Sequence, residues 1–187
     1  DMRTVNLNSP RQTSCNRGSR PLSVLKMKYK TSNSRLAMIA VHLKAGGSPR
    51  SINKRHKQIR RVMQLKQELT ETGYDKIIIL GDFNTTEFAN NNSDPAHDFR
   101  RQLDQSDLNN TTDQLHCTSY WWGQRDDQHF YPSHLDHILT SSSIQTNGRP
   151  KVYGHCQQLR CQSAHENRMQ VSFDEISDHC PISVDID

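Results

Sequence analysis

The stretch Ile77-Ile78-Ile79-Leu80-Gly81-Asp82-Phe83-Asn84 decides the fold. A short apolar run that ends in Gly is typical of a buried strand. The strand predicted over 76–80 therefore carries Asp82 and Asn84 at its C-terminal tip. Because strand tips are rigid, this tip can hold a catalytic carboxylate in a fixed position.

Two later motifs also place acidic residues beside apolar runs. Leu135-Asp136-His137-Ile138 opens a strand predicted over 135–141, and Ser177-Asp178-His179 precedes a closing strand predicted over 180–186. Carboxylate oxygens are the ligands that hard cations such as Mg²⁺ prefer. A His beside a metal carboxylate, oriented by a second Asp, can act as a general acid or base. These residue types therefore indicate metal-assisted acid/base chemistry.

A fourth segment, Ile39-Ala40-Val41-His42-Leu43-Lys44-Ala45-Gly46-Gly47, lies upstream of a helix rich in Arg, Lys and Gln. In this order and spacing, the four segments resemble the C-terminal half of the endonuclease/exonuclease/phosphatase superfamily, the DNase I-like phosphodiesterases. The resemblance covers roughly residues 20–187. It implies an α/β fold, a two-sheet sandwich flanked by helices. Residues 21–187 would be the C-terminal part of the catalytic domain and residues 1–20 a polar tail or loop.

The resemblance also implies a role for each motif residue. Asp82 would position or deprotonate the attacking water, and Asn84 would hydrogen-bond the phosphate or that water. Asp136 would orient His179 and stabilise its charged form, so that His179 acts as the acid/base at the phosphate. Asp178 would be a metal ligand.

Further residues are candidates for contact with the substrate. His42 ends the buried strand predicted over 36–43, and the resemblance implies that it contacts the scissile phosphate or the leaving group. Lys44 and Arg55 belong to a basic region that favours polyanions, although a charged helix is usually a solvated face. Trp121 and Trp122 can stack on bases, although paired aromatics in a loop more often serve packing.

The remaining elements follow from local signals. Ser48-Pro49 predicts a helix start, with Ser as the cap and Pro in the first turn, and Gly73 predicts its end. Asp94-Pro95 opens a second helix to about Leu103. We expect a further strand over 22–30, irregular structure over 105–133 and a loop-rich region over 142–176.

Charge is divided unevenly along the chain, whose net charge is +4. Residues 1–66 contain 16 of the 24 Lys and Arg and one of the 20 acidic residues. A basic region favours polyanions such as nucleic acid, and an acidic region repels them unless cations intervene, as at a metal site. The alternative is that the two regions attract each other within the fold.

The five cysteines suggest an oxidising compartment, and hence a secreted or periplasmic protein; they are Cys15, Cys117, Cys156, Cys161 and Cys180. The short spacing predicts a disulfide between Cys156 and Cys161. A zinc site is the alternative, since His155 and His165 flank the same two cysteines, but the spacing matches no common structural zinc pattern. The odd count leaves one thiol free or paired with the missing half of the catalytic domain.

One part of the family pattern is missing from this sequence. The family carries a metal-binding Glu in its first strands, whereas the residues before His42 contain one acidic residue, Asp1, and no Glu. The hydrophobic content of 32% is also low for a globular domain. We therefore expect a companion, the N-terminal half of the same precursor as a separate or cleaved chain, to supply the Glu. The sequence contains no run of 18 apolar residues, so it predicts no membrane span.

Together these features predict a metal-dependent phosphodiester hydrolase, and first a secreted nuclease acting on DNA or RNA. The expected cofactor is Mg²⁺, with Mn²⁺ or Ca²⁺ as alternatives. The alternative enzyme is a phosphodiesterase or phosphatase that acts on a lipid or other small phosphoester. The alternative of another class is a non-catalytic binding module that lacks the metal Glu.

Overall fold

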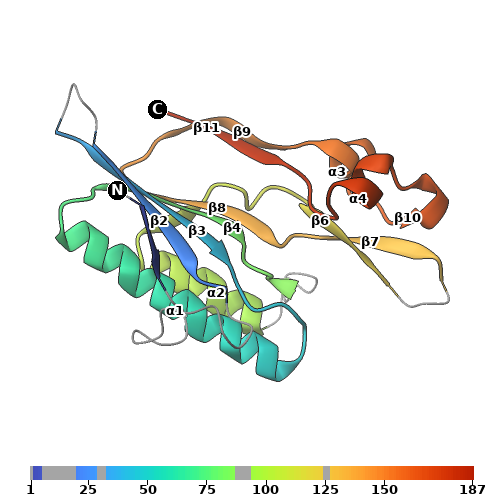
Figure 1. The fold of residues 1–187 in the computed structure, drawn as a ribbon, viewed down its shortest axis with the longest axis horizontal. Coiled ribbons are helices and arrows are strands. Elements are labelled where there is room, and N and C mark those ends of the chain that lie inside the picture. The colour runs from blue at the N-terminus through green and yellow to red at the C-terminus, as the bar shows by residue number, and fades with distance from the viewer. Residues whose placement is uncertain (1, 6–19, 29–32, 87–93, 124–126) are drawn as a thin grey trace.

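The largest layer of the protein is a six-stranded mixed sheet with helices on one face (Figure 1). The structure, a computed structural model, describes residues 2–5, 20–28, 33–86, 94–123 and 127–187. The strands follow the order β1-β2-β3-β4-β8-β5, where β3 and β4 are parallel and the other pairs antiparallel. Their bounds are β1 Met2–Val5, β2 Leu22–Lys28, β3 Arg35–His42, β4 Lys76–Asp82, β8 Asp136–Ser141 and β5 Leu108–Asn110.

The long helix α1 (Pro49–Glu71) begins and ends as its sequence predicts. Ser48 is the N-cap, and its hydroxyl accepts a hydrogen bond from the Ser51 N–H. Beyond the C-cap, Gly73 takes a φ of 86°, a conformation that favours Gly. The second predicted helix is also confirmed, as α2 (Asp94–Asp104).

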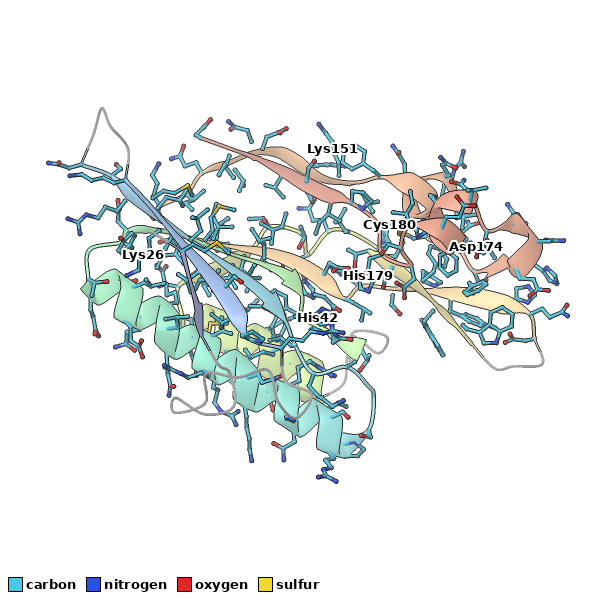
Figure 2. The ribbon with its side chains drawn as sticks, viewed as in Figure 1. Lys26, His42, Lys151, Asp174, His179 and Cys180 are labelled. Carbon is cyan, nitrogen blue, oxygen red and sulfur yellow. A yellow bond between two sulfur atoms is a disulfide. The ribbon has the colours of Figure 1, made fainter. Side chains whose placement is uncertain are left out.

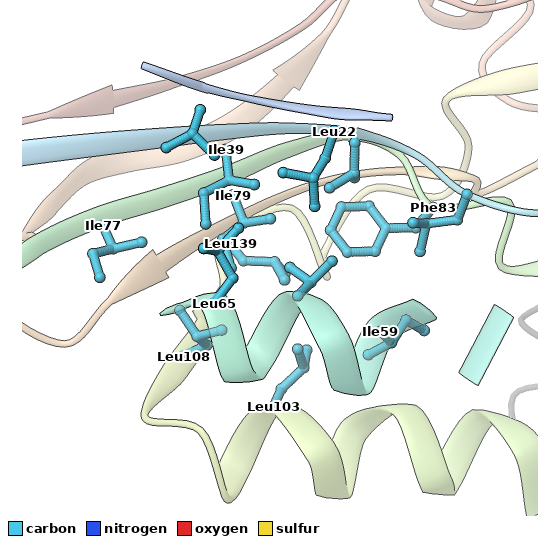
Figure 3. Close-up of a cluster of buried hydrophobic side chains, with 14 of the residues drawn as sticks. Leu22, Ile39, Ile59, Leu65, Ile77, Ile79, Phe83, Leu103, Leu108 and Leu139 are labelled. Atoms are coloured by element: carbon cyan, nitrogen blue, oxygen red, sulfur yellow. The ribbon is translucent and has the colours of Figure 1, made fainter. Parts of the chain in front are cut away.

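The main core lies between the sheet and these two helices. Figure 3 shows Ile77 and Ile79 of β4 facing Leu65 of α1 and Leu103 of α2. Burying each such side chain contributes about 1.5–3 kcal/mol. Ile78 projects from the other face of β4 and belongs to a second, smaller apolar cluster. Both faces of β4 are therefore apolar, as the continuous run of isoleucines predicts.

Two smaller sheets and several short helices complete the molecule. One sheet pairs β10, β7 and β6, and the other pairs β11 with β9 across the sheet face opposite α1 (Figure 1). The bounds are β6 Ser119–Trp122, β7 His129–Ser133, β9 Thr146–Val152, α3 Gly154–Gln158, β10 Ala164–His165, η2 Glu166–Arg168, α4 Val171–Glu175 and β11 Ile182–Ile186. Within the described residues, no helix is long and apolar enough to cross a membrane.

Three sequence predictions differ from this arrangement. The region 105–133, expected to be irregular, contains β5, β6 and β7, and the loop-rich region 142–176 contains β9 and short helices. Residues Met2–Val5, expected in a tail, form the edge strand β1 through antiparallel pairing with β2. Most of these strands are short. Apart from β6 and β7, which pair with each other, their partners are distant along the chain, so local periodicity does not predict them. Most of the predicted tail, residues 6–19, lies outside the described residues.

The disulfides join Cys117 to Cys161 and Cys156 to Cys180, so the predicted Cys156–Cys161 pairing is wrong. Cys156 is buried in α3 and is bonded to Cys180, which lies two residues before β11. Cys161 follows the turn after α3, where its N–H donates to the Cys156 carbonyl and its sulfur reaches Cys117. The alternative zinc cluster fails for the same reason, because both of its sulfurs are oxidised. Cys15 lies outside the described residues.

Both disulfides close long loops, with sequence separations of 44 and 24 residues. In the chain-entropy account, each cross-link stabilises the fold by about 3–4 kcal/mol. Reduction should therefore lower the free energy of unfolding by several kcal/mol, as measured by urea denaturation with and without a dithiol. The paired variants Cys117→Ser/Cys161→Ser and Cys156→Ser/Cys180→Ser should each reproduce part of this loss. A peptide map of unreduced protein that links Cys156 to Cys161 would contradict the assignment.

Candidate active site

Three predicted site residues lie side by side because of the strand register. His42 at the end of β3 pairs with Asp82 at the end of β4, and Asp82 pairs with Asp136 at the start of β8. Parallel strands bring their C-terminal ends to the same edge of a sheet, and the antiparallel β8 begins there. The His42 Nε2 and Asp82 Oδ2 atoms are 3.2 Å apart.

Gly81 allows β3 and β4 to approach closely just before the site. Its φ is 129°, and a Cβ at this position would lie 2.2 Å from the Val41 carbonyl oxygen. No side chain fits at that distance, so the Gly of the Gly-Asp-Phe-Asn motif is a steric requirement. The close strand pairing that follows is what places Asp82 against His42.

His179 reaches the site from the segment between α4 and β11 (Figure 2). Its Nδ1 lies 2.7 Å from Asp136 Oδ2, and its Nε2 lies 4.0 Å from Asp82 Oδ2. The predicted pairing of Asp136 with His179 is therefore present in the geometry. Ser177 fixes the local turn, because its hydroxyl accepts a hydrogen bond from the His179 N–H.

Asn84 orients the carboxylate of Asp82. Its backbone N–H donates to Asp82 Oδ1 at 2.7 Å, and its side-chain amide donates to Asp82 Oδ2 at 2.8 Å and to the Leu43 carbonyl at 3.1 Å. A φ of 52° makes this double contact possible, and Asn tolerates that conformation better than most residues do. With these donors engaged, Asn84 holds Asp82, and a contact with phosphate stays a prediction.

The environment moves three pKa values in different directions. The hydrogen bond that His179 donates to Asp136 raises the pKa of His179 to about 9, against an opposing effect of burial. Burial raises the pKa of Asp82, which the backbone N–H of Asn84 partly offsets. Burial lowers the pKa of His42, and Arg20, whose guanidinium contacts the ring, lowers it further. Near neutral pH the site thus combines a cationic His179 with a neutral His42.

The oxygen donors at this edge suit a hard divalent cation. They include the carboxylates of Asp82, Asp136 and the exposed Asp178, whose charge contributes to the raised pKa of His179. However, among the described residues the ligand atoms close enough to form a preformed three-residue metal cluster are those of His155, Cys156 and Cys180. Two of these are joined in a disulfide. The donors at the strand tips are therefore of the right kind, and a metal there would need a further ligand.

Arg55 does not reach the site surface, so its prediction as a substrate contact is wrong. It is fully buried and donates to the Lys44 carbonyl at 2.7 Å, the Gly46 carbonyl at 3.1 Å and Thr86 Oγ1 at 3.0 Å. A buried guanidinium needs such acceptors. Its role is to hold the loop that follows His42. Lys44 lies in that loop, half-buried, and its N–H donates to Gln58.

The two tryptophans project from β6 in different surroundings. Trp121 is 52% exposed, with its ring centroid 5.9 Å from that of Tyr131. Trp122 is half-buried and packs edge-on against Phe130, with ring centroids 4.7 Å apart. Trp121 thus keeps a free surface for a ligand, whereas Trp122 serves packing.

Sequence reasoning missed the residues that support the His179 segment. Ser119 forms a β-bridge with His179, and the Tyr120 N–H donates to the Asp178 carbonyl at 2.9 Å. Both belong to the region expected to be irregular. Their neighbours Trp121 and Trp122 are aromatic residues of the kind that strands favour, and this was the local indication of strand β6 in the sequence.

Comparison with known proteins agrees with the predicted family and fold. A model described as the endonuclease/exonuclease/phosphatase family matches residues 22–179, and no curated protein matches the sequence. The fold is similar to a mannosyl-6-phosphatase from Bacteroides thetaiotaomicron, with a TM-score of 0.60 and 16% identity over 100% of this chain and 66% of that one.

Two further solved structures have the same fold. The human Nocturnin catalytic domain with bound sulfate has a TM-score of 0.56 and 19% identity, covering 98% of this chain and 58% of that one. D. rerio TDP2 in complex with a single-strand DNA product has a TM-score of 0.57 and 14% identity, covering 100% and 67%. The chain thus spans about two thirds or less of the length of these structures. The predicted DNase I-like α/β fold is confirmed.

The raised pKa of His179 should make stability depend on pH. The imidazolium gains its Asp136 partner only in the folded chain, so this stabilisation is complete below about pH 6.5 and is lost as the pH rises through about 9. We expect it to amount to about 2 kcal/mol after allowance for solvent screening. The difference in unfolding free energy between wild type and His179→Gln, measured in urea, should shrink across this range.

The Asp136→Asn background provides the control for this experiment. Without the carboxylate, the same comparison at His179 should show little dependence on pH. A wild-type advantage that stays constant or grows from pH 6.5 to above 9 would contradict the assigned charge state.

Proposed function

Because the chain belongs to the endonuclease/exonuclease/phosphatase family, whose members are hydrolytic enzymes that use divalent metal ions, we propose that it hydrolyses phosphodiesters. We propose specifically that it is a secreted or periplasmic nuclease. The observation that carries the proposal is the arrangement of Asp136, His179 and Asp82 at one sheet edge, with an Nδ1–Oδ2 distance of 2.7 Å and an Nε2–Oδ2 distance of 4.0 Å. A charged imidazole and a half-buried carboxylate then face each other.

In this proposal, water attacks the phosphorus in line with the leaving oxygen. Asp82 takes a proton from the water, and its raised pKa makes it a better base than an exposed Asp. Asn84 keeps the Asp82 carboxylate in a single orientation through two hydrogen bonds. Asp82 as the base and His179 as the cation follow a common pattern, in which the environments of two neighbouring titratable groups give them different charge states.

His179 stabilises the charge that develops on the phosphate. Asp136 binds Nδ1, so Nε2 points toward Asp82 and the volume where a phosphate oxygen would lie. With a pKa of about 9 the imidazolium persists at neutral pH, and it donates a hydrogen bond to that oxygen. His42, neutral because burial lowers its pKa, supplies a second imidazole that approaches the same oxygen of Asp82.

A divalent cation, Mg²⁺ in the first place and Mn²⁺ or Ca²⁺ as alternatives, would neutralise phosphate charge and stabilise the leaving oxygen when bound. Asp178 would hold it from this chain. A further carboxylate would come from a companion segment, because the strand-tip carboxylates do not by themselves form a compact three-residue cluster among the described residues.

We propose that this companion, the N-terminal half of the same precursor as a separate or cleaved chain, covers the part of the sheet face opposite α1 that β9 and β11 leave open. That face carries the second apolar cluster, in which Met38, Leu80 and Ile138 are only partly buried, and nearby Leu25 is 39% exposed. Apolar surface of this kind favours a packing partner. Native mass spectrometry of the protein from its source should reveal the companion. Isolation of these 187 residues alone as a compact, Mg²⁺-dependent nuclease would contradict it.

Nucleic acid is the favoured substrate because of charge and an aromatic surface. Arg50, Lys57 and Arg60 are exposed on α1, within the basic first third of the chain. Trp121 offers an exposed ring of the kind that stacks on bases. The alternative, a small or lipid phosphoester, is favoured by the similarity to a sugar phosphatase. A binding module without catalysis is the third possibility.

The variants Asp82→Asn and His179→Ala should each lower phosphodiesterase activity of the complete enzyme by about 10²–10⁴-fold, because both act in the transition state. Folding should be nearly unchanged. Asp185→Asn, an exposed Asp on β11, and His97→Ala, an exposed His on α2, are matched controls that should keep full activity. Retention of more than about a tenth of the activity in either site variant would refute the assigned roles.

Metal and substrate class are tested in the same assay. Single-stranded and duplex DNA, RNA, a sugar phosphate and a lipid phosphodiester are compared with Mg²⁺, with EDTA, and with EDTA followed by excess Mg²⁺ or Mn²⁺. We expect hydrolysis of nucleic acid that EDTA abolishes and Mg²⁺ restores. Full activity in EDTA would exclude the metal-dependent mechanism, and hydrolysis confined to the small or lipid esters would select the alternative enzyme.

A further inference from the structure

Thr118 lies at the junction of the two segments that supply the Asp136–His179 pair. It is fully buried and directly precedes β6. Its hydroxyl oxygen accepts hydrogen bonds from the N–H of Leu135 at 3.0 Å and of Asp136 at 2.9 Å. Its carbonyl accepts a hydrogen bond from the Cys180 N–H at 2.8 Å. One residue thus binds the start of β8 and the residue that follows His179.

We propose that Thr118 is a positioning residue that sets the distance between Asp136 and His179. These two residues are 43 positions apart in sequence and belong to separate sheets or loops, so no single element fixes their separation. The Thr118 hydroxyl fixes the backbone of Asp136, and its carbonyl fixes the backbone next to His179. The 2.7 Å contact between Nδ1 and Oδ2 therefore depends on a frame centred on this residue.

The chemistry of the side chain explains why a hydroxyl is needed here. A hydroxyl oxygen has two lone pairs and can accept from two neighbouring N–H groups at once. Valine has nearly the same shape but no acceptor, so it would leave the N–H groups of Leu135 and Asp136 without their partner in a buried place. Serine keeps the oxygen and removes only a methyl group. Comparing Thr, Val and Ser at position 118 therefore distinguishes the effect of hydrogen bonding from the effect of packing.

The two disulfides hold the segments next to Thr118 and His179 but do not fix the orientation of single residues. Cys117 precedes Thr118 and is tied to Cys161, and Cys180 follows His179 and is tied to Cys156. These covalent ties keep both segments in place, and the Thr118 N–H adds a bond to the Ser133 carbonyl at 2.8 Å. The two bonds to the hydroxyl then determine how the first residues of β8 are oriented toward His179.

The test compares Thr118→Val with Thr118→Ser, and it rests on the proposed hydrolytic function only for its kinetic part. In the complete enzyme, the valine variant should lose about 10²-fold in kcat with little change in KM, because a small misplacement of catalytic groups is enough for such a loss. The serine variant should stay close to wild type. Thr140→Val is the matched control, since Thr140 is buried on the same strand β8 and its hydroxyl has no hydrogen-bond partner among the described residues.

A spectroscopic measurement tests the same inference without any activity. The His179 Nδ1 proton, hydrogen-bonded to Asp136, should give a downfield proton resonance in wild type, Thr118→Ser and Thr140→Val, and this resonance should be lost or moved in Thr118→Val. The amides of Leu135 and Asp136 should exchange with solvent faster in the valine variant alone. If wild type shows this resonance yet hydrolyses no phosphodiester, the proposed function fails while the positioning role stands.

Two outcomes would overturn the positioning role. One is a folded Thr118→Val variant that keeps both the kcat and the downfield resonance. The other is a folded Thr118→Ser variant that loses either of them, which would mean that packing rather than the hydroxyl matters. The serine variant alone decides the question if the valine variant does not fold.

Discussion

The pairing of β4 with its two neighbours is the constraint on which the rest of the site depends. The register that aligns Asp82 with His42 on one side and with Asp136 on the other converts three distant sequence positions into one row of side chains. Gly81 makes this pairing possible, since any side chain there would collide with the Val41 carbonyl. The apolar side chains of β4 pack between the helices and the second cluster, so the row rests on the main core of the molecule.

Electrostatics then gives Asp82, His42 and His179 different characters. Burial acts on all three, but it raises the pKa of the acid Asp82 and lowers that of the base His42, because it always disfavours the charged form. His179 escapes this trend only because Asp136 accepts its hydrogen bond at 2.7 Å. The charge on His179 is therefore a consequence of one contact, and that contact joins two separately packed parts of the chain.

The sequence predicts the strand-tip residues of the site well, but it predicts the disulfides and buried contacts around them poorly, for physical reasons. The run of isoleucines before Asp82 and the Ser-Pro start of α1 are local signals, and both elements formed as expected. The Cys117–Cys161 and Cys156–Cys180 pairings depend on how separate segments meet in space, which spacing along the chain does not encode. The prediction that Arg55 contacts the substrate failed for a related reason. The charge of Arg55 suggested an exposed face, but two carbonyls of the loop after β3 and the Thr86 hydroxyl make its burial possible.

The site is thus built from two cores of different strength. Asp82 and His42 depend on the large apolar core beneath the six-stranded sheet, whereas His179 depends on a small cluster that includes Tyr120 and the buried Cys156 and Cys180. A small core contributes little hydrophobic stabilisation, so cross-links are the natural means of keeping it folded. Conditions that weaken the disulfides should therefore displace His179 first and leave the row at the end of β4 in place, because the two parts do not share a core.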